Sequence, residues 1–225
     1  MSQSRNETLT CPRCGTQGEF TVWDSINADQ DPDLKEKLLD ESLFVWRCPR
    51  CGHQSYITFG TLYHDMGRQF MLFFDHKEGE ADISEDNFPV DEIFKGGDKH
   101  YKLRYVHGIR SLKEKIFIFE EGLSDIAVEL IKYFVRNQVI KIKGTRADYF
   151  ENKGIYFAER DRREEEGLDD LVFVVTSGDK VVSKFTVSMD LYEQCLQKMW
   201  LDERFAERDT VKNVCYEWID AKMKS

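Results

Sequence analysis

The sequence contains no hydrophobic run approaching the ~20 residues that span a bilayer, and its first residues show neither an apolar core nor a cleavage site. It also lacks an excess of positive charge, because 42 acidic side chains outnumber 32 basic ones and leave a net charge of −10. Such a chain is unsuited to general binding of polyanions, which depends on Lys and Arg neutralising phosphates. We therefore expect a cytoplasmic protein that does not bind membranes and that acts through a protein partner, with nucleic acid as the less favoured alternative.

Signatures of common enzyme classes are also missing. We find no P-loop, no G-x-S-x-G, no H-E-x-x-H and no dinucleotide-binding glycine pattern. Nothing in the sequence argues for an enzyme, so we assign no catalytic and no cofactor-binding residue. An enzyme with a pocket between the two halves of the chain remains a third hypothesis. The oligomeric state is not indicated.

Four of the six cysteines form the strongest signal. They lie in two identical pentapeptides, Cys-Pro-Arg-Cys-Gly, at residues 11–15 and 48–52. A Cys-x-x-Cys turn followed by Gly is typical of a metal knuckle, and two knuckles provide the four sulfurs of a tetrahedral structural zinc site. The sequence therefore predicts a closed Zn²⁺ site whose ligands are Cys11, Cys14, Cys48 and Cys51.

Three other chemistries were weighed for these cysteines. A redox dithiol requires a strand before the first cysteine and a helix opening at it, whereas only ten residues precede Cys11 and a β-alternating run follows Cys51. Structural disulfides are disfavoured in a reducing compartment. An iron centre with four thiolates shares the zinc geometry and stays open.

Cys195 and Cys215 lie on apolar stripes with helical spacing, which indicates core positions.

The pattern along the chain predicts an α+β protein. An N-terminal four-cysteine zinc-ribbon-like module should continue into an antiparallel sheet and a helical hairpin, and a second α+β segment should follow, giving domains at 8–140 and 141–225. Strands are expected at 20–23, 43–47, 53–59, 70–74, 102–106, 155–157, 171–175 and 181–187. Helices are expected at 32–39, from Leu112 to Gly122 behind a capping box at Ser111, from about Asp125, at 190–201 and at 210–222.

Several polar residues invite a functional interpretation. His64 and Asp65 are adjacent on a predicted strand, where successive side chains face opposite sides, so we interpret them as local hydrogen-bonding groups rather than a catalytic pair. His53 could reach the metal, but four thiolates already fill a tetrahedral site. The aspartates between 29 and 33 are expected to cap a helix and solvate a loop. The stretch 78–92, with seven acidic residues and no basic one, is expected to be an exposed connection.

The stretch 95–115 is the main support for the nucleic-acid hypothesis. It carries seven basic residues against two acidic ones, with tyrosines interleaved, and aromatic side chains among basic groups can stack bases. The candidate contacts are Lys99, Lys102 and Arg104. The alternative that we favour places Lys102 and Arg104 on the solvated face of an edge strand whose Leu103 and Tyr105 point inward.

The two knuckles, together with further anchors between and after them, resemble the CpXC domain family of bacteria and archaea. The anchors are Ile26-Asn27, Asp31 to Leu39, Leu43-Phe44 and Leu62 to Asp65, and the resemblance spans about residues 8 to 135. One departure is Glu41, where many relatives are expected to have Gly, which affects the turn before Leu43. The resemblance implies a metal-binding domain of uncharacterised function and supplies no substrate.

Overall fold

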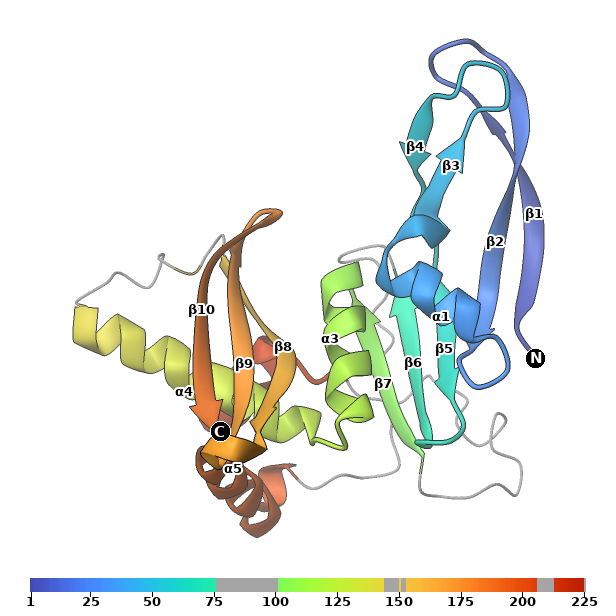
Figure 1. The fold of residues 1–225 in the computed structure, drawn as a ribbon. Helices are drawn as coiled ribbons and strands as arrows, with labels where there is room; N and C mark the ends of the chain where they lie inside the picture. The colour runs from blue at the N-terminus through green and yellow to red at the C-terminus, as the bar shows by residue number, and fades with distance from the viewer. Residues whose placement is uncertain (76–100, 144–149, 151–152, 206–212, 225) are drawn as a thin grey trace. The chain divides into compact units, whose positions relative to one another are not determined.

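The computed structural model describes residues 1–75, 101–143, 150, 153–205 and 213–224. The chain divides into two compact units, Met1–Leu112 and Lys113–Ser225 (Figure 1). Among the described residues there are five α-helices and ten strands, which confirms the α+β class. The expected domain boundary at residue 140 stays a prediction, and the acidic stretch 78–92 lies outside the described residues.

The first unit contains a five-stranded sheet in the order β1-β2-β5-β6-β7. Its core is aromatic and aliphatic, with Tyr63, Phe70 and Leu72 fully buried. The β2/β5 and β6/β7 pairs are parallel, so the sheet is mixed and the expectation of a purely antiparallel sheet was wrong. The strands are β1 (Gln3–Thr10), β2 (Gln17–Asn27), β5 (Thr61–Asp65), β6 (Phe70–Asp75) and β7 (Lys102–His107).

Strands β1 and β2 extend beyond the rest of the sheet as a two-stranded arm. Only residues 25–27 of β2 pair with β5, whereas β1 pairs with β2 along its whole length. A second hairpin, β3 (Val45–Arg47) with β4 (Gln54–Tyr56), lies against this arm (Figure 1). The Trp46 indole N–H donates to the Glu19 carbonyl at 3.1 Å, and the Phe20 and Phe59 rings make an edge contact at 6.0 Å. The turn between β1 and β2 and the turn between β3 and β4 therefore lie next to each other.

Helix α1 (Pro32–Leu39) confirms the helix expected behind Asp31. Asp31 occupies the N-cap position, but its carboxylate makes no capping bond and instead accepts from the Ser2 hydroxyl at 2.5 Å. The 3₁₀ turn η1 (Ser42–Phe44) follows. Glu41, which precedes it, has a left-handed backbone with φ of 65°. That conformation favours glycine, which explains in physical terms why Gly was expected at this position.

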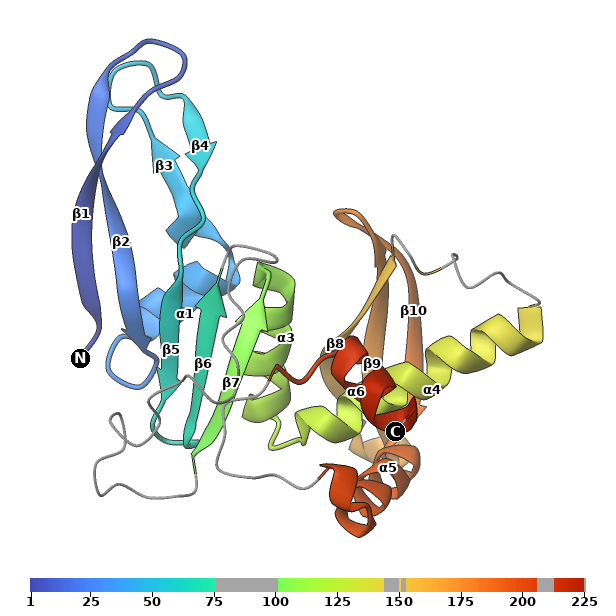
Figure 2. The ribbon, with the colours of Figure 1, turned by 180° about the vertical axis from the view of Figure 1, so that it is seen from behind.

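The second unit combines a three-stranded antiparallel sheet with helices. The sheet has the order β10-β9-β8, built from β8 (Lys153–Arg163), β9 (Leu168–Ser177) and β10 (Lys180–Ser188). Helix α3 (Ile109–Glu120) begins in the first unit and continues in the second, where α4 (Asp125–Lys143), α5 (Met189–Leu201) and α6 (Tyr216–Lys224) follow. Helix α6 packs beside α4 (Figure 2). The 3₁₀ turns η3 (Glu164–Glu166) and η4 (Glu203–Phe205) complete the unit.

The predicted end of helix α3 is confirmed, whereas the predicted starts of α3 and of the last helix were wrong. Helix α3 stops where expected, because Gly122 has φ of 69° and Leu123 donates to the Ile118 carbonyl at 3.0 Å in a Schellman arrangement. Its start was predicted wrongly, since the helix begins at Ile109 and Ser111 is therefore not a cap. Among the described residues the last helix begins at Tyr216 rather than near 210.

Cys195 is buried in α5 as expected. Cys215 is only half-buried and precedes the last helix, so its predicted place on a helical core stripe was wrong.

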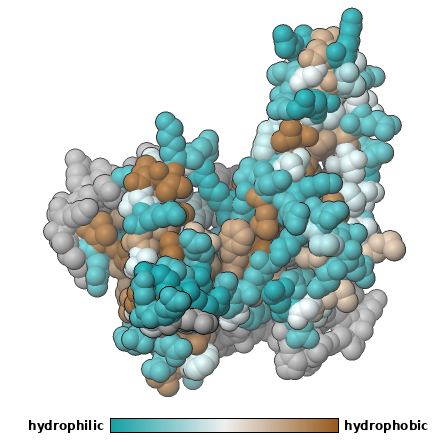
Figure 3. Space-filling model, viewed as in Figure 1, coloured by the Kyte–Doolittle hydropathy of each residue, from teal (hydrophilic) through white to brown (hydrophobic). Residues whose placement is uncertain are grey.

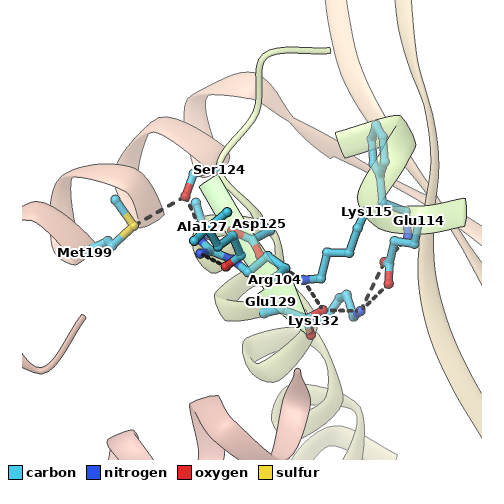
Figure 4. Close-up of polar contacts among 11 residues, drawn as sticks. Arg104, Glu114, Lys115, Ser124, Asp125, Ala127, Glu129, Lys132 and Met199 are labelled. Carbon is cyan, nitrogen blue, oxygen red and sulfur yellow. Dashed lines mark hydrogen bonds and ion pairs between the residues drawn. The ribbon is translucent and has the colours of Figure 1, made fainter. Parts of the chain in front are cut away.

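A cluster of five charged side chains is buried between α3 and α4 in the second unit (Figure 4). Lys132 Nζ lies 3.1 Å from both carboxylate oxygens of Glu114 and 2.8 Å from Glu129. Lys115 Nζ lies 3.1 Å from Asp125 and 3.5 Å from Glu129. Each lysine thus bridges two carboxylates, as buried charges require.

The same cluster reaches the sheet. Glu114 accepts a hydrogen bond from the Phe157 backbone N–H of β8 at 2.6 Å. Burial raises the pKa of Glu114, although Lys132 acts in the opposite direction. The pKa of Lys132 is raised, because the carboxylates of Glu114 and Glu129 outweigh the cost of burial. This network joins two helices and a strand through buried charges, in addition to their apolar contacts.

Candidate metal centre

The two Cys-Pro-Arg-Cys-Gly segments adopt the same backbone conformation. In the first, Gly15 N–H donates to the Cys11 carbonyl at 2.9 Å, and in the second, Gly52 N–H donates to the Cys48 carbonyl at 3.0 Å. Both glycines have φ of 69°, a left-handed conformation that side chains disfavour. The glycine in the pentapeptide is therefore required by the turn.

Each segment is closed at its base by a further hydrogen bond. Cys11 N–H donates to the Thr16 carbonyl at 2.9 Å, and Cys48 N–H donates to the His53 carbonyl at 2.8 Å. The first turn joins β1 to β2 and the second joins β3 to β4. Two equivalent hairpin turns thus present two cysteines each.

The four sulfurs come together crosswise. Cys11 Sγ lies 3.6 Å from Cys51 Sγ, Cys14 Sγ lies 3.6 Å from Cys48 Sγ, and all four lie within 4.8 Å of one another. A tetrahedron with metal–sulfur bonds of ~2.3 Å has sulfurs ~3.8 Å apart. A disulfide needs about 2.05 Å, so all four cysteines are free in this structure. The donor set and the spacing fit a tetrahedral metal ion.

Burial differs within each pair. The leading cysteines, Cys11 and Cys48, are 1% and 2% exposed, whereas Cys14 and Cys51 are intermediate. Gly18 allows the close approach of the two hairpins, because a Cβ atom there would lie 2.9 Å from the Pro49 ring. The backbone packing thus brings the two cysteine pairs together without requiring a disulfide.

The metal-free thiols have unequal proton affinities. Hydrogen bonding with the hydroxyl and then with the backbone N–H of Thr16 lowers the pKa of Cys14 to about 6. Backbone N–H groups of Cys51 and then Arg50 lower the pKa of Cys48. The His53 N–H acts in the same direction on Cys51, but burial and the neighbouring thiols outweigh it and raise that pKa to about 11. The turns therefore favour the thiolate at Cys14 and Cys48 but not at Cys51, where a bound cation would have to supply the compensation.

In the described part of the chain, the group that could hold a metal ion consists of these four cysteines. It does not include His53, which contributes its backbone to the second turn. Sequence reasoning identified the cysteines but missed the contributions of Thr16 and Gly18. Thr16 acts within the first turn, through hydrogen bonds to Cys11 and Cys14, whereas Gly18 acts through the tertiary approach of the two hairpins, which no spacing rule indicates.

His64 and Asp65 do not form a pair. His64 Nε2 lies 3.1 Å from the Tyr101 hydroxyl, whereas Asp65 is buried and accepts from the Arg68 backbone N–H at 2.8 Å. Asp29 accepts from the backbone N–H groups of Met66, at 2.6 Å, and Gly67. These carboxylates hold the turn between β5 and β6, so the expectation of local hydrogen bonding is confirmed.

Of the three basic residues considered for nucleic acid, Arg104 is buried and Lys102 is half-buried. Arg104 is 3% exposed, so its expected place on a solvated strand face was wrong, and the side chain is not available to a phosphate. Its guanidinium donates to the Leu103 carbonyl at 3.0 Å. Leu103 and Tyr105 are buried as expected, and the Tyr105 hydroxyl donates to Asp75 at 2.9 Å. Lys99 lies outside the described residues.

No helix among the described residues is long and apolar enough to cross a membrane.

In comparisons with known proteins, the family described as CpXC protein matches residues 9–132. No curated protein and no solved structure matches the chain. The matched range contains both cysteine pairs and extends through the whole of α3 and into α4.

Proposed function

The chain belongs to the CpXC protein family, and from that premise we propose that it is a non-enzymatic zinc-binding protein that acts through a protein partner. Cys11, Cys14, Cys48 and Cys51 would hold one Zn²⁺. The observation that carries this proposal is the crosswise 3.6 Å approach of the two cysteine pairs.

A structural role follows from the number of donors. Four thiolates occupy all positions of a tetrahedral zinc ion and leave none for a substrate or an activated water. The loaded centre would carry a charge of −2, which the backbone N–H groups of the two turns partly offset. Metal binding of this type contributes about 10–16 kcal/mol in small zinc-finger peptides. The metal would therefore hold the two hairpins together.

The protein-partner role rests on surface charge and on the burial of Arg104. With a net charge of −10, the protein is repelled by phosphate backbones on average. One of the three basic side chains considered for the nucleic-acid hypothesis, that of Arg104, is inaccessible. The acidic surface favours a partner that carries a basic or polar face.

Native mass spectrometry of the purified protein tests the metal. We expect one zinc per chain in the wild type and in the control Cys195→Ser, and no metal in Cys48→Ser. Iron would be recognised by its mass and by its visible absorbance. A metal-free wild type lighter by about 2 or 4 Da would indicate disulfides and overturn the zinc proposal.

Affinity capture from the native cytosol tests the partner, with the protein as bait before and after nuclease treatment. We expect a protein that is retained after nuclease treatment and lost with the Cys48→Ser bait. Capture that disappears with nuclease, together with salt-dependent binding of single-stranded RNA or DNA, would favour the nucleic-acid alternative instead. Recovery of nothing above background would count against the partner role.

A further inference from the structure

Strand β1 is a long exposed edge. Among the residues that the structure describes, it pairs with β2 on one side only, and it stands at the end of the sheet order. Seven of its eight residues are exposed and the eighth is intermediate (in Figure 3 the arm is mostly teal and white). Edge strands offer unpaired backbone N–H and C=O groups to another strand, and proteins usually block them with proline, with bulges or with like charges. The single irregularity of β1 lies at its beginning, between Gln3 and Ser4.

The two charges of β1 have opposite signs and lie on one face. Arg5 donates to Glu7 at 3.0 Å and also pairs with Asp24 of β2. Both strand residues are about half exposed. These side chains flank Asn6, whose own side chain lies on the other face because successive residues alternate.

We propose that a second copy of this chain adds its β1 antiparallel to β1, with the two-fold axis at Asn6. In that register Arg5 of each copy lies directly opposite Glu7 of the other. Cross-strand neighbours of opposite charge stabilise a sheet, whereas like charges placed opposite each other destabilise it. Centring the pair on Arg5 or on Glu7 would instead bring like charges face to face.

The exposed edge strand of the second unit provides the internal contrast. β10 is also almost entirely exposed, and Val181 and Val182 near the hairpin tip are 57% and 53% exposed. Its charged residues, Lys180 and Lys184, are both positive. A symmetric pairing of β10 with itself places each lysine opposite a neutral residue or opposite another lysine, so it never forms a pair of opposite charges. Of these two edges, β1 is self-complementary and β10 is not.

Charge exchange tests the interface in the full-length, metal-loaded protein. We expect light scattering to give twice the chain mass of 26.5 kDa for the wild type at low salt. Arg5→Glu alone and Glu7→Arg alone should each halve that mass, since either change places like charges opposite each other. The exchanged double variant should restore the dimer, and an equal mixture of the two single variants should form a mixed dimer.

Two controls keep the result interpretable. Lys184→Glu on β10 should leave the mass unchanged, and circular dichroism should show that every variant folds.

A cysteine cross-link tests the register. Asn6→Cys should form an intermolecular disulfide between the two copies of residue 6, identified by peptide mass spectrometry. Residue 8 faces Ser4 of the other copy, so Thr8→Cys should not link to itself. A monomeric wild type, or a dimer that persists in both single variants, would overturn the proposal, whatever the zinc content proves to be.

Discussion

Lys132 Nζ lies equidistant, at 3.1 Å, from the two carboxylate oxygens of Glu114, and both side chains are buried. Removing one partner of such a pair leaves an uncompensated charge in the interior. We expect Lys132→Met to lower the free energy of unfolding by about 3–5 kcal/mol, as measured by urea denaturation.

The double variant Glu114→Gln with Lys132→Met should lose less stability than the sum of the two single variants, because no buried charge of that pair is then left alone. The exposed pair of Lys224 and Asp220 is the control, and Lys224→Met should change little. Equal losses of unfolding free energy in Lys132→Met and Lys224→Met would contradict the expectation that the buried ion pair matters more for stability than the exposed one.

Packing at Gly18 should control how firmly the metal is held. A Cβ atom there would lie 2.9 Å from the Pro49 ring and 3.1 Å from the Trp46 ring. Gly18→Ala should therefore push the second cysteine turn away from the first and accelerate transfer of zinc to a chromogenic chelator.

The matched substitution is Gly167→Ala in the second unit. It carries a backbone cost of about 1 kcal/mol for a left-handed position but meets no atom within 4 Å. Zinc transfer at the wild-type rate is expected from this control. The same acceleration in both variants would show that general destabilisation, and not the contact with Pro49, is responsible.

Acid should destabilise the first unit through His64. Burial lowers the pKa of His64 despite the opposing carboxylates of Asp29 and Asp65. The folded state thus binds its proton less readily than the unfolded state, so the stabilisation is present above about pH 6.5 and is lost as the pH falls.

We expect the stability of the wild type relative to His64→Gln to decrease between pH 7.5 and pH 5.5. Comparing the two chains at each pH cancels the contribution of the metal ligands, which is common to both. Parallel pH profiles would rule out a role for this histidine.

Removal of the metal should expose a defined set of thiols. In the zinc-loaded protein we expect Cys11, Cys14, Cys48 and Cys51 to resist iodoacetamide, because bound thiolates are poor nucleophiles. Chelation should make these four reactive, while Cys195 remains protected by burial, which also raises its pKa. Peptide mass spectrometry locates each modified site, and modification of all four before chelation would argue against a bound metal.

The sequence was most informative where one local pattern decides the structure. Repeated pentapeptides, a proline at the start of α1 and a glycine after α3 each determine a short backbone segment, and the structure contains all of them. Each cysteine turn forms as expected because it needs only local residues, whereas the meeting of the two turns depends on the packing of the two hairpins.

Prediction failed where the deciding contacts come from distant residues. Strand β1 was missed because its residues are polar, so no hydrophobic alternation reveals it. Glu114 and Arg104 were assigned to solvent-facing or capping roles because sequence patterns treat charge as a sign of exposure, whereas both are buried. Such burial depends on partners such as Lys132, which no local rule identifies.

The two cysteine turns enclose an insert of 33 residues that contains β2, α1, η1 and β3. The entropy of closing a loop grows only with the logarithm of its length, so doubling the insert would cost the centre about 0.6 kcal/mol. A centre of this type can therefore accept inserts of very different lengths between its turns. Searches that require a fixed interval between the two Cys-x-x-Cys segments would overlook chains that build the same cluster.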